Sequence, residues 1–94
     1  MNKKENKVLQ IERVQTGVRM EKRILKVLKG VAEYLDISLG ELLEIMALHN
    51  FEGRHPFTEE NRRRITKLKE IYEMNYDAHA YERFCESKRS GMED

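Results

Sequence analysis

The sequence contains one cysteine, one proline and no tryptophan in 94 residues. Because a disulfide needs two cysteines, the single Cys85 excludes a disulfide within the chain. No apolar run approaches the roughly 18 residues that a membrane-spanning helix needs, so we expect no transmembrane role. The residues after Met1 do not combine a basic start with an apolar core and a cleavage site. We therefore expect a cytoplasmic protein without contact to a membrane.

The sequence also lacks the motifs of common enzymes. It has no glycine-rich phosphate loop, no nucleophile elbow and no Ser/His/Asp arrangement, so we expect no catalytic residues and no cofactor. The candidate metal ligands are His49, His55, His79 and Cys85. They have neither paired-cysteine nor His-x-x-x-His spacing, which argues against a metal site. The sequence thus favours a binding protein over an enzyme.

Charge is abundant but unevenly distributed. Charged residues make up 37% of the chain and its net charge is only +1. Residues 1–30 contain nine Lys or Arg and three Glu, a net charge of +6, whereas residues 31–60 contain one Arg and seven acids, a net charge of −6. A basic first third is typical of a surface for nucleic acid or for an acidic partner. The alternative is a solvated charged tail.

Hydrophobic periodicity predicts one strand and two helices in the first half of the chain. From Val14 to Met20, apolar and polar residues alternate, which is typical of a short amphipathic strand that begins at either Val8 or Arg13. The period then changes to about 3.6 and predicts a helix over 21–35. Ser38 and Glu41 have the spacing of a capping box, which predicts that a second helix begins there and ends near Gly53.

The second half of the chain is expected to be helical as well. Thr58 can cap a third helix that runs to about Glu73, and Asp77 can cap a fourth segment. We therefore divide the chain into a flexible basic N-terminal arm (1–12), a central domain (13–53) and a helical C-terminal extension (54–94).

A single strand leaves both of its edges unpaired, so the strand and two helices are too little to fold alone. Two copies overcome this difficulty if their strands pair antiparallel across a twofold axis. The fold class expected is thus mainly α: one short strand paired across a dimer, two core helices, and one or two C-terminal helices. The expected dimer core consists of Val14, Thr16, Val18, Met20, Ile24, Leu28, Val31, Leu42, Leu43 and Met46.

This strand-helix-helix pattern, from about Arg13 to Phe51, resembles the ribbon-helix-helix family of DNA-binding proteins. The segment from Val18 through Leu43 aligns with the family pattern without a gap. The resemblance implies that a two-stranded ribbon enters the major groove of double-stranded DNA. It also implies a homodimer, with higher oligomers possible on DNA.

The resemblance implies two groups of DNA-contacting residues. Alternate strand residues Gln15, Gly17 and Arg19 are expected to face bases, and Arg19 is suited to bidentate contact with guanine. Gly17 has no side chain for readout, so it either reduces specificity or permits a close approach of the backbone. The expected phosphate contacts are Arg13, Lys22, Arg23, Ser38, Leu39 and Gly40. For Ser38 the alternative is that it forms only a capping box with Glu41.

Two functions follow from these observations. The first is a homodimeric, sequence-specific DNA-binding protein and transcriptional regulator. The second is a protein-interaction module, such as an antitoxin or a dimeric scaffold that does not bind DNA, with the C-terminal extension as a site for a protein partner. The basic first third favours DNA binding, whereas the acidic middle third and the long extension favour the protein-interaction module.

Overall fold

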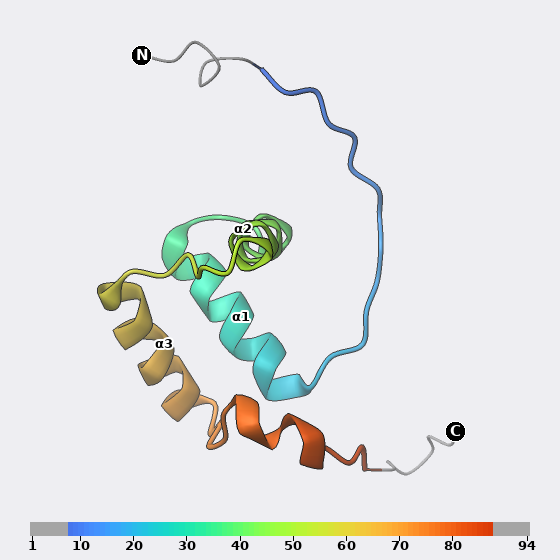
Figure 1. Ribbon diagram of the computed structural model, residues 1–94. Helices are drawn as coiled ribbons and strands as arrows, with labels where there is room; N and C mark the ends of the chain where they lie inside the picture. The colour runs from blue at the N-terminus through green and yellow to red at the C-terminus, as the bar shows by residue number, and fades with distance from the viewer. Residues whose placement is uncertain (1–7, 88–94) are drawn as a thin grey trace.

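The computed structural model describes residues 8–87. In this range the chain forms three α-helices and a 3-10 helix, and Figure 1 shows an irregular segment, residues 8–20, that runs outside the helical body. Residues 1–7 of the predicted arm and residues 88–94 of the predicted extension lie outside the described residues. The elements are α1 (Lys22–Leu35), α2 (Leu39–Phe51), α3 (Glu59–Ile71) and η2 (Ala78–Arg83).

Local sequence explains where the helices begin. The Ser38 hydroxyl accepts a hydrogen bond from the Glu41 amide at 3.0 Å, and the Glu41 carboxylate accepts one from the Ser38 amide at 2.9 Å, so the predicted capping box is confirmed. Thr58 caps α3 as predicted, and Asn61 completes a second capping box there. Asp77 caps η2 by accepting a hydrogen bond from the His79 amide.

Helix α1 is the centre of the fold, because it packs against both α2 and α3. The buried core is small and consists of Val27, Val31 and Ala32 of α1 with Leu42 of α2. Half-buried apolar residues from all three helices and from the loops surround this core. They are Leu28, Leu35, Ile37, Met46, Phe57, Ile65, Leu68, Tyr72 and Met74.

Gly30 allows α1 and α3 to approach closely. A Cβ atom at this position would lie 2.8 Å from Leu68 Cδ2, closer than side chains normally approach one another. A glycine in the middle of a helix costs about 1 kcal/mol relative to alanine. The glycine occupies the position where the backbone of α1 lies close to the Leu68 side chain.

The predicted ribbon-helix-helix fold is wrong for the described residues, although the mainly α part of the prediction is right. Residues 8–87 contain no β-strand, and no backbone hydrogen bond joins residues 8–20 to one another or to another strand. The alternation of apolar and polar side chains favours a strand only where a partner edge satisfies the backbone N–H and C=O groups. No other segment in this range supplies such an edge.

The expected dimer core is divided between two environments. Val31 and Leu42 are buried, and four residues are half-buried on the helices, namely Ile24, Leu28, Leu43 and Met46. The strand contribution is not buried, because Val14 and Val18 are 78% and 73% exposed, and Thr16 and Met20 are exposed as well.

Candidate functional site

Basic charge is concentrated on the two helices that pack together, α1 and α3. Helix α1 contains four basic residues and one acid, a net charge of +3, and α3 contains five basic and three acidic residues, a net charge of +2. Helix α2 contains two acids and no Lys or Arg. Because α1 and α3 lie side by side (Figure 1), the fold brings together two basic segments that are far apart in the sequence.

Most of these cations have no ionic partner among residues 8–87. The ion pairs of residues 8–87 are Arg13–Glu44, Arg19–Glu86, Arg23–Glu21, Arg54–Glu52 and His79–Asp77. Of the nine bases of α1 and α3, these pairs include Arg23 and none of the remaining eight. These eight are Lys22, Lys26, Lys29, Arg62, Arg63, Arg64, Lys67 and Lys69.

The spacing of acids and bases in α3 is suited to ion pairs between residues four apart, but the structure forms other contacts. The Glu60 carboxylate accepts a hydrogen bond from the Tyr34 hydroxyl of α1 at 3.3 Å. The Arg64 guanidinium lies 4.3 Å from the centroid of the same Tyr34 ring. Arg64 therefore lies at the seam between α1 and α3, and it forms no ion pair with a carboxylate of residues 8–87.

Helical geometry gathers six of the free cations. Residues three and four apart share a helix face, so Lys22, Lys26 and Lys29 lie together on α1. On α3, Lys67 follows Arg64 by three residues and Arg63 by four, so these side chains also lie on neighbouring positions of one helix surface. The Lys26 ammonium lies 5.7 Å from the Tyr72 ring, just beyond the end of α3, so it reaches the seam from the other helix. We define the basic surface as Lys22, Lys26, Lys29, Arg63, Arg64 and Lys67.

A shallow groove of about 520 Å³ joins the start of α1 to the end of α3. Lys22, Arg23 and Lys26 line it from α1 with Glu21 just before them, and Ile71, Tyr72 and Glu73 line it from the other side. The groove is open to solvent, and its lining combines three cations with two carboxylates. Its openness is suited to an extended ligand rather than to an enclosed small molecule.

The three predicted base-facing residues lie apart from the helices. Gln15, Gly17 and Arg19 are exposed in the irregular segment 8–20. Arg19 forms an ion pair with Glu86, and both of these side chains are mostly exposed. The structure thus places Arg19 near the end of the described chain, an association that nothing in the local sequence indicates.

Arg13, a predicted phosphate contact, is held by helix α2. Its guanidinium donates two hydrogen bonds of 2.9 Å to the Glu44 carboxylate. This fork raises the pKa of Arg13 and lowers that of Glu44. Both side chains are substantially exposed, so the pair contributes little to stability.

The predicted phosphate contacts divide by helix. Ser38 is engaged in the capping box, which uses two polar groups that a phosphate at this helix end would otherwise contact. Leu39 and Gly40 form the first residues of α2. Lys22 is the first residue of α1, and its exposed side chain belongs to the basic surface. Arg23, its neighbour, is engaged by Glu21.

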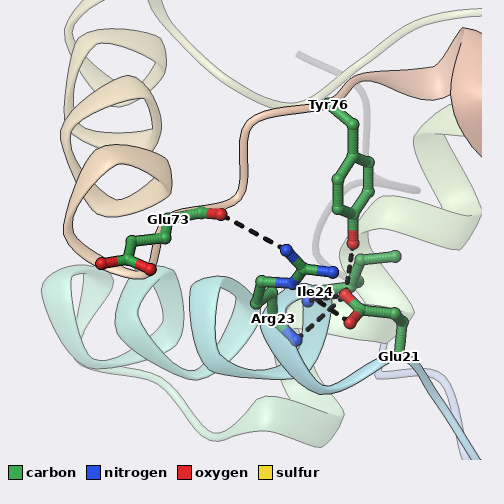
Figure 2. A network of polar contacts seen from close by, with 5 residues as sticks. All are labelled: Glu21, Arg23, Ile24, Glu73 and Tyr76. Carbon is green, nitrogen blue, oxygen red and sulfur yellow. Dashed lines mark hydrogen bonds and ion pairs between the residues drawn. The ribbon is translucent and has the colours of Figure 1, made fainter.

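A polar network that sequence reasoning missed surrounds the N-terminal end of α1 (Figure 2). The Glu21 carboxylate caps the helix by accepting hydrogen bonds from the Arg23 and Ile24 amides at 3.0 and 3.2 Å. The same carboxylate accepts a hydrogen bond from the Tyr76 hydroxyl. Glutamate is not among the preferred N-cap residues, and Tyr76 is 55 residues away, so no local pattern predicts this contact.

The network shifts the pKa of two of its members. Partial burial and the hydrogen bond to Glu21 raise the pKa of Tyr76 to about 12. Desolvation by burial acts to raise the pKa of Glu21, but the hydrogen bonds from Tyr76, the Ile24 amide and Arg23 outweigh it and lower that pKa. The carboxylate therefore stays ionised and the phenol stays protonated at neutral pH.

Two further features of residues 8–87 bear on the expectations from sequence. No helix in this range is long and apolar enough to cross a membrane. No cluster of three or more His, Cys, Asp or Glu side chains in the same range is arranged to hold a metal ion.

Comparison with known proteins does not extend this description. No family model matches the chain, and no curated protein or solved structure matches it. The comparisons therefore leave the resemblance to the ribbon-helix-helix family untested.

Proposed function

We propose that the protein binds double-stranded DNA through the basic surface of α1 and α3. The observation that carries this proposal is a set of eight cations on two helices that pack together, none of which has an ionic partner within the described part of the chain. Unpaired surface cations repel one another, and a polyanion relieves that repulsion while releasing its counterions. The open groove beside Lys22 and Lys26 leaves room for an extended ligand, although Glu21 and Glu73 also line it.

Salt dependence provides the first test. If all six cations of the basic surface contact phosphates, the logarithm of the affinity falls against the logarithm of salt concentration with a slope of about −5. Fluorescence anisotropy with a labelled duplex, titrated over a salt series, measures this slope. A salt-independent affinity, or no binding at low salt, would contradict the proposal.

Matched variants locate the surface. Lys29→Ala and Lys67→Ala each remove one cation from the basic surface, and each is expected to reduce the steepness of the salt dependence by about 0.9. Arg54→Ala is the control, because it also removes one positive charge but its side chain pairs with Glu52 in the loop after α2. Equal effects of all three substitutions would point to net charge rather than to this surface.

The proposal includes sequence-specific binding and a regulatory role. Gln15 and Arg19 are candidates for base contacts because their side chains are exposed. Selection of bound fragments from random genomic DNA, followed by sequencing, tests this part. An enriched motif that disappears with Arg19→Ala would support base readout, and recovery of unselected sequences would contradict it.

The proposal also takes the protein to be a cytoplasmic homodimer. The apolar side chains of α2 are not confined to one stripe, a pattern that favours packing on more than one side, although Glu41 and Glu44 are exposed. One side packs on α1, but Leu48 and Phe51 are 63% and 81% exposed. Sedimentation over a range of concentrations tests self-association. We expect a dimer that Phe51→Ser weakens, and a wild-type monomer at every concentration would contradict this part.

The same exposed side chains favour a second candidate function, a protein-interaction module. Val8, Leu9, Val14 and Val18 of the irregular segment are each more than 70% exposed, in addition to Leu48 and Phe51 of α2. Apolar exposure of this extent is typical of a surface that another protein covers. Purification from native lysate separates the candidates: a stoichiometric protein partner without DNA supports the module, and DNA alone supports the first function.

A further inference from the structure

The C-terminal part of the described chain, residues 72–87, returns to the N-terminal end of α1 (Figure 1). The half-buried Tyr76 donates a hydrogen bond to the Glu21 carboxylate there. Arg23 lies between the two segments. Its guanidinium carbon lies 5.1 Å from the centroid of the Tyr76 ring, and Nη1 donates a 3.5 Å hydrogen bond to the Glu73 carbonyl (Figure 2). We name residues 72–87 the C-terminal strap.

The strap has its own internal structure. Glu73 adopts a left-handed backbone conformation with φ of 57° and turns the chain away from α3. Phe84 then packs edge-on against the Tyr76 ring, with centroids 5.4 Å apart, and against Tyr81 at 5.1 Å. Ala80 of η2 is buried. The strap therefore attaches as a folded unit, with Tyr76 as its anchor.

Charge gives this attachment a functional meaning. The strap contains four acids and one Arg, a net charge of −3, whereas the end of α1 that it approaches carries Lys22 and Arg23. Its outermost acid, Glu86, pairs with Arg19, which lies two residues before Glu21. A carboxylate on a guanidinium uses the same donors that a phosphate would use.

We propose that the C-terminal strap is an intramolecular competitor of DNA, which occupies Arg19 through Glu86 until a duplex displaces that contact. This inference rests on the proposed function. The two ends of the strap differ in strength. Arg19 and Glu86 are 81% and 72% exposed, so their pair is weak and exchanges easily. Tyr76 is half-buried and stacked, so it retains the strap near the site after Glu86 is released.

Glu86→Gln in the full chain tests the outer contact. It removes the charge that engages Arg19, and we expect a two- to fivefold lower Kd for duplex DNA, about the change that an exposed ion pair corresponds to. Freeing this cation for the DNA should also steepen the salt dependence, by at most about 0.9. The matched control is Glu52→Gln, which makes the same charge change at an equally exposed carboxylate paired with Arg54.

Tyr76→Phe tests the anchor, because it removes the hydroxyl and keeps the aromatic ring. We expect a lower Kd for DNA together with faster hydrogen exchange at the Ala80 and Phe84 amides, which bond within the strap. Exchange at the Leu42 amide, which bonds to Ser38 at the start of α2, is the internal control.

Three outcomes separate the two proposals. A gain in affinity for Glu86→Gln and Tyr76→Phe, but not for Glu52→Gln, supports the strap. Equal affinities of wild type, Glu86→Gln and Glu52→Gln overturn the strap while leaving DNA binding in place. The absence of duplex binding by every protein, wild type included, overturns DNA binding and the strap together.

Discussion

Leu42 is the side chain on which the packing of α2 against α1 depends most. It is 1% exposed and the largest fully buried side chain of the described residues. Truncation of a leucine in such a position costs about 2 to 5 kcal/mol, which combines the lost transfer free energy with the cavity that remains. At about 0.05 to 0.15 kcal/mol per residue, the total free energy of unfolding of a chain this size is roughly 5 to 14 kcal/mol. Leu42→Ala therefore removes a large share of the stability.

Urea denaturation followed by circular dichroism measures this loss, with all proteins at one concentration because self-association would make the apparent stability concentration-dependent. We expect the free energy of unfolding of Leu42→Ala to fall by about 2 to 5 kcal/mol in these curves, and its melting temperature in a thermal scan to fall by at least about 8 °C. Ile71→Ala is the control, since Ile71 is 67% exposed on α3 and its truncation should change stability by no more than about 0.5 kcal/mol. Equal losses in the two variants would refute the assignment of Leu42 to the core.

Three further predictions concern local features. Thr58→Ala should lower the free energy of unfolding by about 0.5 to 2 kcal/mol, because it removes the α3 cap. Thr66→Ala, at an exposed position within the same helix, should not lower it. Equal effects of the two substitutions in urea denaturation would contradict the capping role. Asp36→Gly should raise the free energy of unfolding by up to about 1 kcal/mol, because Asp36 has a φ of 62°, a conformation that glycine adopts without strain; a destabilised variant would contradict this reasoning. The tyrosinate absorbance that the wild type shows and Tyr76→Phe lacks should titrate near pH 12 rather than near pH 10. Because the raised pKa belongs to the folded state, the contribution of Tyr76 to stability is complete below about pH 10 and is lost as the pH rises toward 12. A difference titration centred at pH 10 would show that the contact with Glu21 is absent in solution.

The helices were predictable because the information that specifies them is local. The change of period after Met20 predicts a helix over 21–35, and α1 spans Lys22–Leu35. Ser38 and Glu41 predict the start of α2, and both hydrogen bonds of their capping box form. Thr58 and Asp77 predict the starts of α3 and η2 in the same way. The caps depend on residues within about one helical turn, and the period of α1 depends on one continuous stretch of sequence.

The candidate site was predictable only in part. The basic first third of the sequence directs attention to Lys22 and Arg23, and Lys22 belongs to the basic surface. The contribution of α3 depends on its packing against α1, which the contact between Gly30 and Leu68 permits. Whether Arg64 pairs with Glu60 or lies over Tyr34 depends on that packing as well. The sequence alone offers both arrangements.

The sequence by itself determined the helices, their caps and the uneven distribution of charge, because these depend on neighbours within a few residues. The tertiary structure decided the fate of residues 8–20, since alternation of side chains specifies a strand only when another edge completes its hydrogen bonds. It also decided which cations remain unpaired and brought Tyr76 to Glu21 across 55 residues. Such contacts depend on how helices and loops pack in three dimensions, and no local pattern in the sequence specifies them.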